Sequence, residues 1–144
     1  MISRIAVGGL GLVLLCCWAA GCGGVDVGRQ GDQSLKVLEL SPRDGEVGVP
    51  PATDVVAVFS AAMAVGEGDD KLNERTFYVE DDQGTRLSAT VRLSELDDQS
   101  ATAVIRLADL DAGASYTVVL VASLQGDGTA PLGSEIRATF RVAE

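Results

Sequence analysis

Residues 110–120 of this 144-residue chain read LDAGASYTVVL, and this stretch decides the fold class. From Ser115 to Ser123 the sequence alternates in the manner of a β-strand, and one face of that strand carries Tyr116, Val118, Leu120 and Ala122. Leu110, Gly113 and Tyr116 have the spacing of a tyrosine corner, in which the tyrosine hydroxyl reaches back to the backbone a few residues upstream. Such a corner pins the turn between two sheets. We therefore expect Tyr116 to have a structural role and not a catalytic one.

Six other short segments show the same alternation and are separated by turn residues. They span residues 35–40, 54–59, 76–80, 87–93, 102–107 and 136–142. The apolar faces expected to be buried are Val55, Ala57 and Phe59; Phe77 and Val79; Leu87, Ala89, Val91 and Leu93; Ala103, Ile105 and Leu107; and Ile136, Ala138, Phe140 and Val142. About seven short strands with no convincing amphipathic helix predict an all-β antiparallel sandwich, with a small barrel as the alternative.

The connections between these strands carry the residues that interrupt regular structure. Pro50 and Pro51 cannot donate to a sheet ladder, so we expect the chain around them to be irregular. Residues 60–64 predict a brief helical turn, and Gly126-Asp127-Gly128 ends the strand that follows the corner. The domain is therefore expected to consist of strands and turns.

The first 22 residues have the pattern of an export signal. Arg4 supplies one positive charge, residues 5–15 are apolar or glycine, and three small residues precede Cys22. The sequence Ala19-Ala20-Gly21-Cys22 resembles the lipobox of bacterial lipoproteins, in which signal peptidase cuts before a cysteine that carries diacylglycerol. We predict that residues 1–21 are a lipoprotein signal peptide and that Cys22 is the lipidated anchor; Cys16 and Cys17 are poorer candidates. An uncleaved membrane anchor and cleavage without a lipid are the alternatives.

The residues after Cys22 predict where the protein goes and how it is attached. Gly23 and not Asp follows the cysteine, so the enterobacterial signal for inner-membrane retention is absent and the outer membrane is the favoured destination. Residues 22–34 are the lipidated cysteine and a Gly-rich flexible tether, and residues 35–144 form one domain. We expect this domain to face the periplasm or the exterior of the cell.

The composition excludes several classes of function. All three cysteines lie at positions 16, 17 and 22, so the domain has no disulfide, and the chain contains no histidine. Removal of residues 1–21 takes away Arg4 and no acid, which leaves 10 basic and 21 acidic residues and a net charge of −11. This acidic balance argues against a nucleic-acid partner and against an electrostatic grip on anionic lipid.

The order of several short motifs resembles one known family. Ser41-Pro42, Gly45 and Val49-Pro50 are followed by Val55-x-Ala57-x-Phe59-Ser60 and Met63, as at the start of bacterial Ig-like domains of the surface-layer-protein type. Leu72-Asn73-x-x-Thr76-Phe77, the corner from Leu110 to Tyr116, and Pro131-Leu132 before the last strand continue the resemblance across most of residues 36–142. The resemblance implies an immunoglobulin-like antiparallel β-sandwich of about seven strands, used as a spacer, stalk or interaction module without enzyme activity, cofactor or fixed ligand. Such domains usually stand in long multidomain chains, whereas we expect this one to stand alone on a lipid anchor.

A second outline, that of periplasmic copper-binding sandwiches, shares the Ser-Pro-x-x-Gly opening and a late Gly-Asp-Gly. Those proteins bind copper through histidine, often with methionine. This chain has no histidine, and Met63 is the one methionine beyond the signal peptide. Without imidazole or thiolate ligands no copper site is expected.

Catalysis and metal binding are both disfavoured by the residues available. A Ser or Thr nucleophile needs a base, and only Lys36 and Lys71 offer an amine, neither of them in a recognisable motif. The paired acids at residues 69–70, 81–82 and 97–98 suit solvated turns better than a glycosidase cleft. Calcium has candidate oxygen ligands in Glu67, Asp69, Asp70 and Asn73, or in Asp109 and Asp111, but their spacing differs from that of an EF-hand. We therefore predict no catalytic residues and no metal site.

Two surface features remain as candidates for binding. Tyr78 is the aromatic residue that alternation places outside the core, and one exposed ring is a poor platform for sugars. Val56 and Val58, with Thr117, Val119 and Val121, place β-branched residues opposite the presumed core, either as an ordinary outer face or as a surface for a partner. We expect a non-enzymatic, lipid-anchored module that contacts another envelope protein or has a structural role. A small ligand-binding or calcium-dependent adhesion domain is the alternative.

Overall fold

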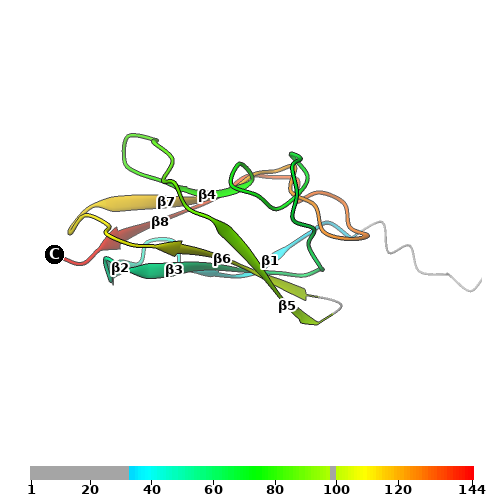
Figure 1. Cartoon of the computed structure of the whole chain (residues 1–144), viewed down its shortest axis with the longest axis horizontal. Coiled ribbons are helices and arrows are strands. Elements are labelled where there is room, and N and C mark those ends of the chain that lie inside the picture. The colour runs from blue at the N-terminus through cyan, green and yellow to red at the C-terminus, as the bar shows by residue number, and fades with distance from the viewer. Residues whose placement is uncertain (1–32, 98–99) are drawn as a thin grey trace, which may run out of the picture.

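A computed structural model describes residues 33–97 and 100–144 (Figure 1). Cys22, the predicted signal peptide and most of the predicted tether lie outside the described residues. The described chain forms eight strands and no helix. The strands are β1 (Val37–Ser41), β2 (Val47–Val49), β3 (Thr53–Phe59), β4 (Phe77–Glu80), β5 (Val91–Asp97), β6 (Ser100–Leu107), β7 (Ser115–Leu120) and β8 (Ile136–Val142).

The strands form two separate four-stranded sheets that lie face to face (Figure 1). One sheet has the order β1-β3-β6-β5 and is antiparallel throughout. The other has the order β2-β8-β7-β4 and is antiparallel except for the parallel pair β2–β8. This arrangement confirms the predicted all-β sandwich and shows that the alternative of a small barrel is wrong.

The core between the sheets follows from the alternation in the strands. Val55, Ala57 and Phe59 on β3 are fully buried, and they lie opposite the equally buried alternate residues of β6. The second sheet contributes Phe77 and Val79 from β4, Tyr116, Val118 and Leu120 from β7, and Ala138, Phe140 and Val142 from β8. These faces are the ones that the period-two pattern predicts. Burial of this apolar set is the main term that holds the two sheets together, since the described residues include no cysteine.

One strand was not predicted from the sequence. β2 lies just before Pro50 and pairs in parallel with β8 at the edge of its sheet. Arg141 N donates to Glu46 O at 2.8 Å and Ala143 N donates to Val49 O at 2.9 Å, so the chain before the prolines is held by β8. A three-residue edge strand is too short to show alternation, which explains why no pattern in the sequence indicates it.

Two local predictions are wrong. Residues 60–64 do not form a helical turn, because Met63 makes a bridge with Gly126 and Ala62 O accepts a hydrogen bond from Asp127 N. The strand predicted from residue 87 begins at Val91, although its alternate apolar residues do pack against the core, namely Leu87, Ala89, Val91 and Leu93. Leu87 N instead donates to Val79 O, so residues 85–87 cover the free edge of β4.

The described chain is fixed to the domain from its first residues. Gln33 O accepts a hydrogen bond from Ala130 N at 3.0 Å, and Leu35 N donates to Ala130 O at 2.9 Å. Leu35 is also buried, with 1% of its surface exposed. Within the described chain, contacts with the domain are therefore already present at Gln33, two residues before the predicted start at residue 35.

Candidate functional surfaces

Tyr116 lies at the start of β7 and holds the turn that precedes it. Its Oη accepts a hydrogen bond from the backbone N–H of Asp111 at 3.1 Å, and its ring stacks on Phe140 with centroids 5.9 Å apart. Gly113 has a φ of +71°, which favours glycine, and its N–H donates to Ala143 O at 3.1 Å. Leu110 is buried beneath the turn. These contacts join the β6–β7 connection to the end of β8 and stabilise the turn between the two sheets.

The loop with the candidate calcium ligands is organised by the side chain of Asn73. Its Nδ2 donates to Gly66 O and Gly68 O, both at 2.8 Å, and to Lys71 O at 3.3 Å. Its Oδ1 accepts from Arg75 N at 2.8 Å, which fixes the orientation of the amide. The inward carbonyls of this loop are thus satisfied by an amide N–H₂ and point at a donor, not at a space for a cation. Among the described residues no group of three or more acidic side chains is placed to hold a metal ion.

Tyr78 is not exposed, contrary to prediction. The guanidinium of Arg86 lies over its ring, 3.8 Å from the centroid, and only 9% of the residue surface is accessible. Arg86 comes from the segment that covers the edge of β4, which the alternation within one strand cannot reveal. The contact stabilises that segment and covers the one aromatic ring that alternation had placed outside the core.

The two outer sheet faces differ in how much apolar surface they leave open. Val119 on β7 is fully buried, because it lies in register between Tyr78 and Arg137 on the neighbouring strands. Arg137 also forms an ion pair with Glu80 across the sheet. On the other sheet, Val56 and Val58 are half-buried. The prediction of an open apolar face is therefore wrong for Val119, whereas Val56 and Val58 remain accessible.

The half-buried valines on β3 lie beside a charged pair that the sequence did not single out. Arg106 Nε on β6 donates to Asp54 Oδ1 on β3 at 3.1 Å, and the two side chains are 75% and 42% exposed. This hydrogen bond, together with the charge of the carboxylate, raises the pKa of Arg106 above its ordinary value. The two residues stand 52 positions apart in the chain, so only the register of β3 and β6 brings them together.

The residues considered for catalysis are placed for other contacts. Lys71 Nζ lies 3.5 Å from Asp70 Oδ2, and Ser60 Oγ accepts from the backbone N of Lys36 at 3.0 Å, not from its amine.

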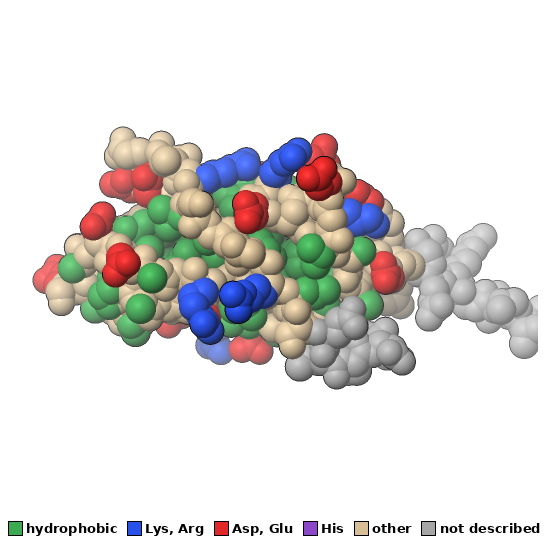
Figure 2. All heavy atoms as spheres, viewed as in Figure 1, with side chains coloured by type: hydrophobic (Ala, Val, Ile, Leu, Met, Phe, Trp, Pro, Cys, Tyr) green, Lys and Arg blue, Asp and Glu red, His purple; other side chains and the backbone are tan. Residues whose placement is uncertain are grey.

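Figure 2 shows acidic and basic side chains interspersed over the visible face. A depression of about 360 Å³ beside Val65 and the start of β5 is lined by Glu67, Asn73, Glu74, Arg75, Thr90 and Val91. No helix of the described chain is long and apolar enough to cross a bilayer.

The division of the strands defines the class of the fold. β1, β3, β5 and β6 form one sheet, and β4, β7 and β8 form the other, with β2 added beside β8. This is the division of an immunoglobulin-like sandwich, in which a tyrosine corner precedes the sixth main strand. Residues 31–142 match the sequence profile of the bacterial Ig-like domain family, and the chain belongs to that family. The finer assignment to the surface-layer-protein type stays a prediction.

Two solved structures show the same fold. Both are of alpha-2-macroglobulin from Escherichia coli: a crystal structure spanning domains MG0-NIE-MG1, and a cryo-EM reconstruction of the native conformation. Each is 18% identical to this chain with a TM-score of 0.53, and each alignment covers 81% of this chain. The chain spans 34% of the first and 6% of the second, so the similarity concerns the fold alone. Curated protein sequences gave no match.

Proposed function

We propose that this protein is a lipid-anchored, non-enzymatic Ig-like module of the bacterial cell envelope, which acts through protein contacts or as a structural element. The observation that carries the proposal is the order of two segments. The lipobox-like sequence Ala19-Ala20-Gly21-Cys22 precedes Gln33 by only a ten-residue spacer, and from Gln33 on the chain is hydrogen-bonded into a closed sandwich. A spacer of that length reaches roughly 20 Å, so the anchor would hold the domain close to a membrane surface.

The chemistry of the domain supports a role in contact. Beyond Cys22 the chain has no histidine, cysteine or tryptophan, and its family is that of bacterial Ig-like domains. Side chains that were considered as a calcium ligand or as a base make contacts within their own loop, as Asn73 and Lys71 do. What the domain offers to other molecules is therefore its surface, on which Leu38 of β1 and Val47 of β2 are exposed and Val56 and Val58 of β3 are half-buried.

The anchor is tested by metabolic labelling with palmitate and by membrane fractionation. Replacement Cys22→Ala should abolish the label and leave the protein unprocessed or released from membranes. Cys16→Ala and Cys17→Ala are matched controls, because they remove the same thiol from the same segment and should keep the label. Label that persists in the Cys22→Ala protein would contradict the assignment of the lipidated residue.

The role in contact is tested separately by cross-linking in the native cell, followed by mass spectrometry. The outcome expected is a small set of cross-linked envelope proteins whose cross-linked peptides map to the sheet faces of this domain. A form that keeps residues 1–32 and carries an unrelated folded domain is the control for proximity caused by the anchor alone. Identical cross-links from both forms would show that the anchor, and not the Ig-like domain, determines the neighbours.

A further inference from the structure

The outer face of the β1-β3-β6-β5 sheet has an ordered pattern of side chains. We use the term outer β3–β6 face for Glu39, Asp54, Val56, Val58, Arg92, Ser94, Thr102, Val104 and Arg106. Their neighbours along each strand point into the core, since Val55, Ala57, Ala103 and Ile105 are fully or almost fully buried. On the two central strands the face has three rows, in which Asp54 pairs with Arg106, Val56 with Val104, and Val58 with Thr102.

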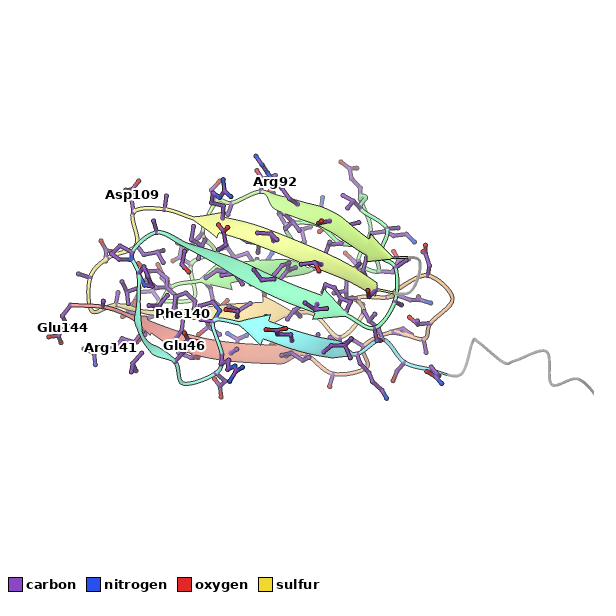
Figure 3. The ribbon with its side chains drawn as sticks, turned by 90° about the horizontal axis from the view of Figure 1, so that it is seen from below. Glu46, Arg92, Asp109, Phe140, Arg141 and Glu144 are labelled. Atoms are coloured by element: carbon purple, nitrogen blue, oxygen red, sulfur yellow. The ribbon has the colours of Figure 1, made fainter. Side chains whose placement is uncertain are left out.

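The two central strands carry one charged pair on this face, with the acid Asp54 on β3 and the base Arg106 on β6. Farther from the line between these strands, Glu39 lies on β1 and Arg92 lies on β5, where Asp97 pairs in register with Ser100. Glu39 and Arg92 have no charged partner within the described residues, and Figure 3 places Arg92 at the β5 margin of the sheet. The uncharged rows of Val56, Val58, Thr102 and Val104 lie between them. Asp54 and Arg106 thus give the two central strands opposite charges at the same level.

A face of this kind is complementary to itself under one symmetry operation. A two-fold axis that runs parallel to the strands, between β3 and β6, places β3 of one copy over β6 of the other while keeping each row at its own level. Val56 then faces Val104 of the second copy, and Asp54 faces Arg106 of the second copy. By symmetry, each of these contacts occurs twice in the dimer. An isologous interface requires this self-complementarity. We propose that the outer β3–β6 face is the interface of a homodimer of this chain, with Asp54 and Arg106 of both copies forming a ring of four alternating charges.

A two-fold axis across the strands would not give the same match. It would place β3 over β3 with the opposite end of that strand above Asp54, so Asp54 and Arg106 of the two copies would no longer face each other. The parallel axis has a further consequence, which rests on the proposed lipid anchor. The described chain begins at one end of the sandwich, and its C-terminus lies at the other (Figure 1). An axis parallel to the strands keeps both starting points at the same end, so both tethers reach one membrane.

The size of the face sets the strength of the dimer. Four strands about 4.8 Å apart and about seven residues long give roughly 450 Å² for each copy. The two copies together bury about 900 Å², which is below the size of stable interfaces and typical of weak association. We therefore expect monomers in dilute solution and dimers at high concentration, or where two anchors share a membrane and raise the effective concentration. Faces of packed sheets are rotated by about 30°, and the long Arg106 side chain spans the resulting offset.

The test uses two variants that reverse one charge each. In Asp54→Arg both residues of the pair are basic, and in Arg106→Glu both are acidic, so each variant repels its own copy. When the two variants are mixed one to one, each base of one copy faces an acid of the other copy across the interface. The ion pair within each copy stays broken, so only contact between the copies can bring opposite charges together. The proteins are the mature chains with Cys22→Ala, which keep the whole described sandwich and need no detergent. Sedimentation equilibrium is measured at low and high salt.

The expected result has three parts. The unsubstituted protein dimerises, each variant alone does so at least tenfold more weakly, and the mixture forms a heterodimer at least tenfold tighter than either variant with itself. Salt at 0.5 M weakens the heterodimer, because it screens the charges. Arg75→Glu is the matched control, since it makes the same charge change at an exposed residue away from this face. Arg75→Glu alone should self-associate as the unsubstituted protein does. Mixed with Asp54→Arg, it should not form the tight heterodimer that Arg106→Glu forms.

Two outcomes would overturn the proposal. One is an unsubstituted protein that stays monomeric up to millimolar concentration, and the other is a mixture that associates no better than its separate components. The measurement is made without the lipid, so its failure leaves the anchoring proposal standing. Loss of the anchoring proposal would likewise leave the interface to be judged by this experiment.

Discussion

Removal of the Tyr116 hydroxyl tests whether the corner holds the turn between the sheets. The variant Tyr116→Phe keeps the ring, which is buried and stacked on Phe140, and deletes only the oxygen that accepts from Asp111 N at 3.1 Å. A single hydrogen bond of this kind contributes about 1 kcal/mol, and the amide left without an acceptor in a half-buried turn adds to the loss. We expect the free energy of unfolding to fall by about 1–2 kcal/mol and the melting temperature to fall by about 4–10 °C.

The matched control for this change is Tyr78→Phe. It removes the same atom from a ring that is covered by Arg86 but whose hydroxyl makes no hydrogen bond within the described chain. We expect its free energy of unfolding to change by less than about 0.5 kcal/mol. Urea denaturation gives both values, and amide exchange at Asp111 reports the turn directly, since that proton should exchange faster only in Tyr116→Phe. Equal stability of the two variants, or unchanged exchange at Asp111, would refute the structural role assigned to Tyr116.

Other predictions concern loop packing and calcium. A Cβ added at Gly126 would lie 2.8 Å from Ala61 Cβ and 3.0 Å from Leu35 Cδ1, so Gly126→Ala should destabilise the domain by about 1–3 kcal/mol in urea denaturation. The control Gly66→Ala meets its nearest neighbour at 3.8 Å and should change stability little; equal losses in the two variants would argue against the crowding. Calcium at millimolar concentration should not change the melting temperature of the unsubstituted protein, whereas Asn73→Asp should lower it by replacing an amide donor with an acceptor that faces carbonyls. A stabilisation of the unsubstituted protein by calcium would reinstate the alternative of a calcium-dependent adhesion domain.

The inward residues of the long strands could be predicted from the sequence because each strand carries its own pattern. Val55, Ala57 and Phe59 alternate with Asp54, Val56 and Val58, and a period of two assigns them to opposite faces without reference to any other strand. β2 could not be predicted in this way, because it has three residues and is held by hydrogen bonds to β8, which lies some 90 residues further along the chain. Its existence depends on the tertiary arrangement and not on a local pattern.

The wrong predictions of exposure also arise because the outcome depends on the tertiary arrangement. Tyr78 and Val119 both lie on an outer face, as alternation predicts, yet both are buried. Their cover comes from Arg86 and Arg137, whose positions follow from the chain path after β4 and from the register of β8. A pattern within one strand gives the direction of a side chain, whereas its exposure depends on the length and charge of the residues beside it on other strands.

The same limit separates what makes this chain fold from what would make it associate. Residues that face the core specify the sandwich, and the residues between them on β3 and β6 specify the outer face, so the two sets can change independently. A related domain with the same core but with charges of equal sign at the positions of Asp54 and Arg106 should therefore fold equally well and stay monomeric. An exposed ion pair contributes little to stability, so the electrostatic order of this face has little effect on folding and a large effect on which surfaces can meet.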